Sequence, residues 1–134
     1  MVKIERENLM LRERDTETPN QILPRASRPV APQIAVAPAN SVTPIVAEAT
    51  RAMLDAGLRD VRNQGVLLNG VNADPHALLD LCFRLLDGAQ IMPYYFYMCD
   101  MIPFSEHWRL SVKEAQRLQH HIMGYLPCFA TPRV

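Results

Sequence analysis

A carboxylate ends the most apolar run of this chain. Asp100 directly follows seven aromatic and apolar residues, Pro93-Tyr94-Tyr95-Phe96-Tyr97-Met98-Cys99. An uninterrupted run of this length predicts a strand that is buried on both faces, as in a parallel sheet. Parallel α/β folds place functional side chains at the carboxyl ends of their strands. Asp100 is therefore a candidate for binding a cationic group in a cleft, and a surface aspartate that opens the next loop is an equal alternative.

Four further polar residues could take part in a site. His107 lies too far along the chain from Asp100 for a simple metal-ligand pair, so a hydrogen-bonded structural histidine is favoured. Arg109 could bind an anion or a loop carbonyl. Asn63 and Gln64 open a shorter apolar run, and their partner could be backbone or a ligand. No catalytic triad, nucleophile elbow or CxxC pair occurs, so these patterns assign no catalytic and no metal-ligating residue.

The elements that would position these residues alternate between helix and strand. Capped starts at Thr43-Pro44, at Asp74-Pro75 and at Ser111 with Glu114 predict three helices. Strands are expected at about 64–68 and 91–99, and a poor last strand is possible at 125–130. This alternation indicates right-handed crossovers and a parallel sheet. Because so few strands cannot close a barrel, we expect an α/β fold that is a fragment of a partial (β/α) barrel.

The chain divides near residue 40. Five of the 11 prolines fall between residues 18 and 40, and proline at that density disfavours both helix and central strand. We therefore expect residues 1–40 to be a proline-rich, largely disordered leader and residues 41–134 to be the α/β segment.

Composition excludes several classes of function. Lys+Arg and Asp+Glu balance at 14 each, so no bulk charge attracts nucleic acid or an anionic membrane. No apolar run is long enough to span a bilayer, and the N-terminus has no secretory signal. Three widely spaced cysteines, Cys82, Cys99 and Cys128, suit reduced thiols. We expect a cytoplasmic protein with neither nucleic-acid nor membrane partners.

Three motifs together resemble those of the lysine 2,3-aminomutase family. The first runs from Asn63-Gln64-Gly65 to Gly70-Val71-Asn72, the second is the run that ends in Asp100, and the third is His107-Trp108-Arg109. The segment Ser41-Val42-Thr43-Pro44, which leads into a helix that ends at Gly57, also fits. The similarity covers about residues 39–127, the C-terminal barrel portion of the family.

The resemblance implies a radical S-adenosylmethionine enzyme that holds a [4Fe–4S] cluster and pyridoxal phosphate and moves the 2-amino group of L-lysine to C3. It implies that Asp100 binds the side-chain ammonium of a lysine-like substrate. It places Gln64 near the S-adenosylmethionine ribose and Tyr97 near the cofactors. Family members form homo-oligomers.

The chain also departs from the family pattern. It contains no CxxxCxxC cluster motif, and the lysine that forms the pyridoxal imine would lie beyond Val134. Asn69 and Ala73 replace the usual Arg and Asp. No cofactor is thus demonstrable in the chain itself, and no catalytic residue is assigned. Three hypotheses stand: a truncated aminomutase that is inactive alone, a subunit completed by a partner chain that carries the cluster, and a small non-catalytic α/β interaction module.

Overall fold

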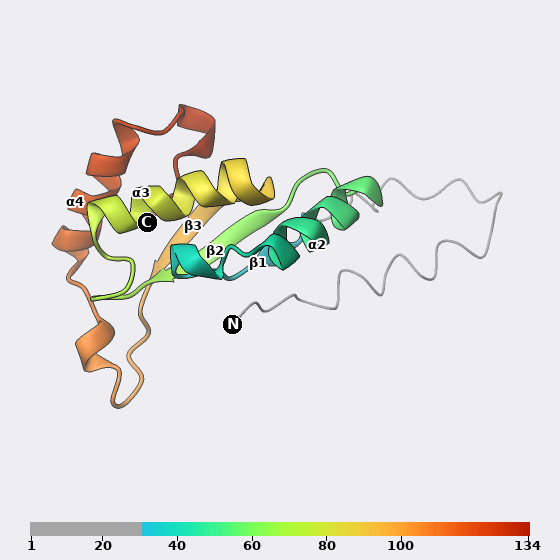
Figure 1. Ribbon diagram of the computed structural model, residues 1–134. Helices are drawn as coiled ribbons and strands as arrows, with labels where there is room; N and C mark the ends of the chain where they lie inside the picture. The colour runs from blue at the N-terminus through green and yellow to red at the C-terminus, as the bar shows by residue number, and fades with distance from the viewer. Residues whose placement is uncertain (1–30) are drawn as a thin grey trace, which may run out of the picture.

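The computed structural model describes residues 31–134, which are built on a three-stranded parallel sheet (Figure 1). Strand β1 spans Gln33–Ile34, β2 spans Arg62–Leu67 and β3 spans Met92–Met98. The central strand β2 pairs in parallel with both neighbours. The expected α/β fold with parallel strands is confirmed, and the sheet is open, as in a piece of a partial barrel.

Each helix begins at a polar side chain that caps its first turn. Helix α2 spans Pro44–Asp55, α3 spans Pro75–Phe83 and α4 spans Val112–Met123. Their caps are Thr43, Asp74 and Ser111, and Ser111 forms a full capping box with Glu114. All three expected helix starts are confirmed. Each cap satisfies amides that the helix itself leaves unbonded.

Short helical turns complete the described chain. Helix α3 continues into a π-helical turn at Arg84–Gly88, and 3-10 turns occur at Ala39–Ser41, Glu106–Trp108 and Cys128–Ala130. No helix of residues 31–134 has the length and apolar character needed to cross a membrane.

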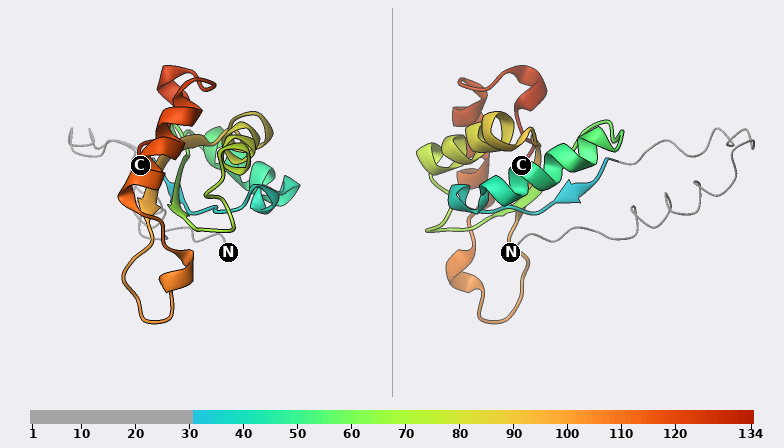
Figure 2. Two further views of the ribbon diagram at one scale, coloured as in Figure 1. Left: turned by 90° about the vertical axis from the view of Figure 1, so that its left-hand side faces the viewer. Right: turned by 45° about the vertical axis from the view of Figure 1, so that its right-hand side comes forward.

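The helices bury one shared core against one face of the sheet (Figure 1, Figure 2). Its largest fully buried side chains include Leu67, Leu78, Leu85, Phe96 and Ile122. Helix α4 contributes a narrow stripe of Ala115, Leu118 and Ile122. The sequence pattern also predicts that Val112 and His121 face inward, and this is wrong, because both are exposed outside that stripe.

The segment before α2 joins the sheet, although its prolines predict otherwise. Ile34 and Val36 are 2% and 1% exposed. The Asn63 side chain holds this segment, since its Oδ1 accepts from the Val36 amide at 2.9 Å and its Nδ2 donates to the Val36 carbonyl at 3.3 Å. The fold therefore already includes residues 33–36 of the predicted leader. The part of that leader before residue 31 lies outside the described residues.

Strand β3 is buried on one face only. Phe96 is 1% exposed, whereas Tyr97 is 49% exposed. The prediction of burial on both faces is wrong, because the three helices share one side of the sheet and nothing in residues 31–134 covers the other.

The predicted last strand at 125–130 is also wrong, since a 3-10 turn takes its place. The chain meets the sheet only afterwards. Arg133 forms a parallel bridge with Tyr95, in which the Phe96 amide donates to the Arg133 carbonyl at 2.8 Å and the Arg133 amide donates to the Tyr94 carbonyl at 3.0 Å. The outer edge of β3 is therefore paired with the chain at this position.

Candidate functional site

The uncovered face of the sheet carries a row of polar and aromatic side chains. Gln64 lies beside Tyr95, and Val66 lies beside Tyr97, in the register of β2 and β3. Residues paired in a parallel register, and those two positions further along, point to the same side of the sheet. Gln64, Tyr95 and Tyr97 therefore share the open face, and the rings of Tyr95 and Tyr97 stack with centroids 5.8 Å apart.

Two cationic side chains border this aromatic row. Arg133 donates to the Tyr95 hydroxyl at 3.3 Å, and its guanidinium lies 6.0 Å from the centre of the Tyr95 ring. Arg62 lies 4.7 Å from the centre of the Tyr94 ring and forms a 2.8 Å ion pair with Asp60. This ion pair raises the pKa of Arg62. The open face thus combines stacked aromatic rings with guanidinium groups, which suits a planar or anionic ligand.

The residues on either side of Gln64 fix its place in the strand. Asn63 is fully buried, and its side chain bonds the Val36 backbone. A Cβ atom at Gly65 would meet the Phe96 ring at 2.9 Å and the Val36 carbonyl at 3.0 Å, so only glycine allows this close approach. Because Asn63 and Gly65 point into the core, Gln64 points to the open face. Its amide has no hydrogen-bond partner among the described residues and is free to bond a ligand.

Asp100 lies two residues beyond β3 at the carboxyl edge of the sheet and is exposed. Its carbonyl accepts from the Ile102 amide at 2.9 Å and from the Ser105 hydroxyl at 3.2 Å. Its carboxylate forms no ion pair within the part of the chain that the structure describes. The backbone of Asp100 is therefore fixed by the loop, while its charge remains available to a cation.

Arg109 organises the loop that follows Asp100. Its Nη2 donates to the Ile102 carbonyl at 3.0 Å and to the Ser105 hydroxyl at 3.3 Å, and it lies 3.8 Å from a carboxylate oxygen of Glu106. Of the two roles left open by the sequence, the structure favours the loop carbonyl. The Nε atom of Arg109 is buried without a hydrogen-bond partner among residues 31–134.

The loop after β3 also bonds the turn that follows β2. The Asn69 amide donates to the Trp108 carbonyl at 2.9 Å, and the Asn69 side chain reaches the His107 carbonyl at 3.4 Å. The turn after β2 is thus tied to the loop after β3. The His107 ring packs on Trp108 with centroids 4.5 Å apart, and its nitrogens bond no other described residue, so the predicted hydrogen bond of this histidine is absent from residues 31–134.

The tip of this loop is apolar and projects from the sheet and helices (Figure 1, Figure 2). Met101 and Phe104 are 89% and 90% exposed, and Ile102 is 58% exposed. Phe104 has a φ of 67°, a left-handed conformation that is strained for an aromatic residue. The sequence does not reveal this apolar tip as a continuous run, because Pro103 and Ser105 separate its apolar residues.

Of the three residues assigned from the resemblance, the structure brings two onto one surface. Gln64 and Tyr97 share the open face, and Asp100 follows at the carboxyl edge of the same sheet. Sequence reasoning missed Tyr95 and Arg133. The period of two from Tyr97 could have found Tyr95, whereas no local signal brings Arg133 to the sheet.

The described residues do not fit an iron–sulfur cluster. Cys82 is fully buried in the core, and burial raises the pKa of its thiol to about 12. Cys99 and Cys128 are free thiols elsewhere in the fold. Residues 31–134 hold no group of three His, Cys, Asp or Glu side chains that could bind a metal. The one lysine of this part, Lys113, lies exposed on α4 rather than on the open face, so no residue there fits a pyridoxal imine.

Comparison with known proteins identifies relatives of one kind. Over 93 residues the chain is 36% identical to a putative L-lysine 2,3-aminomutase of Aquifex aeolicus, which covers 69% of this chain and 25% of the relative. Over 96 residues it is 33% identical to the L-lysine 2,3-aminomutase of Clostridium subterminale, covering 69% of this chain and 23% of the relative. A glutamate 2,3-aminomutase of Clostridioides difficile is 31% identical over 85 residues, which are 63% of this chain and 20% of that protein.

No family model matches the chain. The chain spans about a quarter or less of the length of these curated relatives. These identities over 63–69% of the chain confirm the resemblance. The matched part of this chain belongs to the lysine 2,3-aminomutase family, as its C-terminal portion.

Proposed function

We propose that this chain forms one wall of a lysine 2,3-aminomutase-like barrel and that its open sheet face lines the barrel interior. One observation carries the proposal: Gln64 and Tyr97, from separate motifs, share the uncovered face of a parallel sheet whose other face is filled by helices. In a (β/α) barrel the helices lie outside and the open side of the sheet faces inward. In this arrangement Gln64 binds the S-adenosylmethionine ribose and Tyr97 lies beside the cofactors.

Asp100 is proposed to bind the side-chain ammonium of the amino-acid substrate. Both lysine and glutamate aminomutases are among the relatives, so the family alone leaves the charge of the substrate open. A carboxylate at the carboxyl edge attracts an ammonium and repels a second carboxylate. Asp100 therefore favours a cationic amino acid such as lysine.

A titration that compares amino acids of opposite side-chain charge tests this assignment. We expect L-lysine to shift the amide resonances around Asp100 more strongly than L-glutamate does. A solvent-exposed charge pair is worth about 1 kcal/mol, so Asp100→Asn should weaken lysine binding about five-fold. Asp87→Asn, at an exposed acid after α3, is the matched control. Equal binding of lysine and glutamate, or an unchanged affinity in Asp100→Asn, would contradict the role of Asp100.

The 134-residue chain is proposed to be catalytically inactive alone. When bound, the [4Fe–4S] cluster supplies radical generation from S-adenosylmethionine, and pyridoxal phosphate supplies an imine for amino-group migration. The described residues offer neither three clustered cysteines nor a lysine on the open face, and the printed sequence holds no CxxxCxxC motif. What this chain contributes by itself is binding and orientation.

A second candidate function is that of a subunit whose barrel is completed by a partner chain that carries the cluster. The exposed apolar loop and the uncovered aromatic face favour it, because large apolar surfaces mark interaction sites. Co-expression with a polypeptide that bears a CxxxCxxC motif and matches the rest of the relatives should yield a complex that co-purifies. Separate elution of the two chains would argue against a split enzyme. A cooperative thermal melt of the chain alone, without aggregation, would instead support the non-catalytic interaction module.

A further inference from the structure

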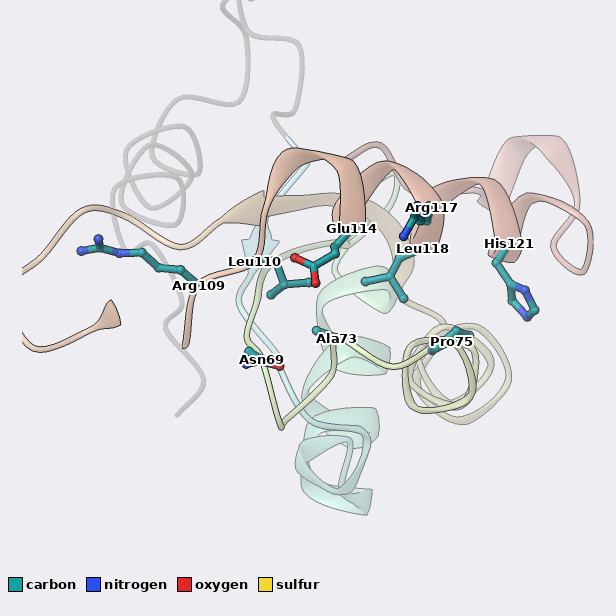
Figure 3. A pocket seen from close by; sticks show the side chains of 9 residues that line it. All are labelled: Asn69, Ala73, Pro75, Arg109, Leu110, Glu114, Arg117, Leu118 and His121. Atoms are coloured by element: carbon teal, nitrogen blue, oxygen red, sulfur yellow. The ribbon is translucent and has the colours of Figure 1, made fainter. Parts of the chain in front are cut away.

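A hollow of about 370 Å³ lies on the helical side of the sheet, away from the open face (Figure 3). It is bounded by α4, by the start of α3 at Pro75, by the turn around Asn69 and by Leu110. Pockets of this volume are within the range that small ligands occupy. Gln64, Tyr97 and Asp100 do not line it, whereas Asn69 and Arg109, from the turn after β2 and the loop after β3, do.

One end of the hollow is anionic. In Figure 3 the carboxylate of Glu114 points toward Leu110 and Ala73. Its Oε2 accepts from the Ser111 amide at 2.8 Å and from the Ser111 hydroxyl at 2.6 Å. These bonds lower the pKa of Glu114. The side chain is thus held in place as a carboxylate, and its second oxygen is free for a ligand.

The basic side chain of His121 lies at the other end of the hollow, and Arg117 lies between the two, one helical turn from Glu114, whose pKa its charge also lowers. Neither basic side chain makes an ion pair or a side-chain hydrogen bond within residues 31–134, and the His121 ring lies beside the Tyr125 ring, with centroids 5.3 Å apart. Arg109 also borders the hollow, but its guanidinium points away (Figure 3) and bonds the Ile102 carbonyl. The usable positive charge therefore lies with Arg117 and His121.

Apolar side chains line the hollow between Glu114 and His121. Leu118 is 6% exposed, and Leu110 and Ala73 pack against the core. Glu114 and His121 are separated by about 10 Å along the axis of α4, because each helical residue rises about 1.5 Å. A ligand that spans the hollow must therefore be a few methylene groups long and carry a charge at each end.

We propose that this hollow binds a linear ω-amino carboxylate, with its ammonium at Glu114, its carboxylate at Arg117 and His121, and its methylene chain on Leu110 and Leu118. The proposal does not rest on the aminomutase function, since it concerns the opposite side of the sheet. A molecule with charge at only one end would leave either Glu114 or the basic side chains without an opposite charge.

The experiment is an NMR titration of the full 134-residue chain with three probes of equal length: 6-aminohexanoate, hexanoate and hexylammonium. We expect 6-aminohexanoate to bind in the millimolar range and to shift the resonances of Leu110, Leu118 and α4. Each exposed charge pair is worth about a factor of five in affinity. Hexanoate and hexylammonium should therefore each bind about five-fold more weakly than the dipolar probe.

Glutamine variants assign the two ends. Glu114→Gln keeps an acceptor for the Ser111 cap and should remove the preference for 6-aminohexanoate over hexanoate. Arg117→Gln should remove the preference over hexylammonium. Glu48→Gln and Arg51→Gln, at exposed positions of α2, are the matched controls and should bind like the parent chain. The proposal is overturned if no probe shifts this region, if hexanoate binds as tightly as 6-aminohexanoate, or if the α4 variants behave like the controls.

Discussion

The substitution Gly65→Ala tests how the core positions the open face. Gly65 lies on β2 directly after Gln64 and faces the core. An added Cβ would stand 2.9 Å from Cε1 and 3.1 Å from Cδ1 of Phe96, and 3.0 Å from the Val36 carbonyl oxygen. Contacts below 3.0 Å force a neighbour to move, and both neighbours are 1% exposed. The methyl group therefore cannot be accommodated without shifting β3 or the segment before α2.

The expected cost follows from two opposing effects. Overpacking a closed core costs about 1–3 kcal/mol. The smaller conformational freedom of unfolded alanine offsets about 0.4–1 kcal/mol of this. We therefore expect Gly65→Ala to lower the free energy of unfolding by about 1–2 kcal/mol, measured by urea denaturation. With a denaturant slope of about 2 kcal/mol per molar, the midpoint should fall by about 0.5–1 M.

Two comparisons make this test specific. Gly88→Ala is the matched control, because a Cβ there meets no atom within 4 Å, and it should be neutral or slightly stabilising. In a Phe96→Leu background Gly65→Ala should cost less, because the ring atoms that it meets are gone. A Gly65→Ala protein as stable as the parent, or an equal cost with and without Phe96→Leu, would refute the close approach of β2 and β3.

Three further predictions concern other contacts of the fold. Asn63→Ala leaves the buried amide and carbonyl of Val36 without partners and should lower the free energy of unfolding by about 2–4 kcal/mol; a urea midpoint equal to that of the parent would show that these bonds do not anchor the segment. Burial raises the pKa of Cys82 from 9.0 to about 12, so the unfolded thiol ionises first and stability should fall above pH 9 by up to about 1.4 kcal/mol per pH unit. Cys82→Ala should flatten this pH dependence, and an identical slope in the variant would exclude the thiol as its source. Hydrogen bonds from Ser111 are the main cause of the lowered pKa of Glu114, so Ser111→Ala should raise that pKa in an NMR titration, and an unchanged value would contradict the capping box.

Local chemistry made the starts of the helices predictable. A cap such as Asp74 before Pro75 states where a helix begins, because the unbonded amides of the first turn need an acceptor nearby in sequence. The resemblance to the aminomutases supplied Gln64 and Tyr97, and the parallel register places them on one face. Asp100 follows directly from the end of β3.

Contacts between distant residues account for what was missed. Strand β1 pairs with β2, and the Asn63 side chain holds the residues just after it by bonding the amide and the carbonyl of Val36. The bridge of Arg133 to β3 joins residues far apart in the chain. The sequence also does not show that one face of β3 is exposed. Tyrosine suits both a core and a wet surface, so its presence does not tell which face is covered.

The most direct test of the proposed role is anaerobic reconstitution of the purified 134-residue chain with iron and sulfide, followed by S-adenosylmethionine and L-lysine. Iron and sulfide content and 5′-deoxyadenosine formation are measured together. A chain that supplies only one wall of the barrel should hold no stoichiometric cluster and form no 5′-deoxyadenosine. A full [4Fe–4S] complement with turnover of S-adenosylmethionine would contradict it.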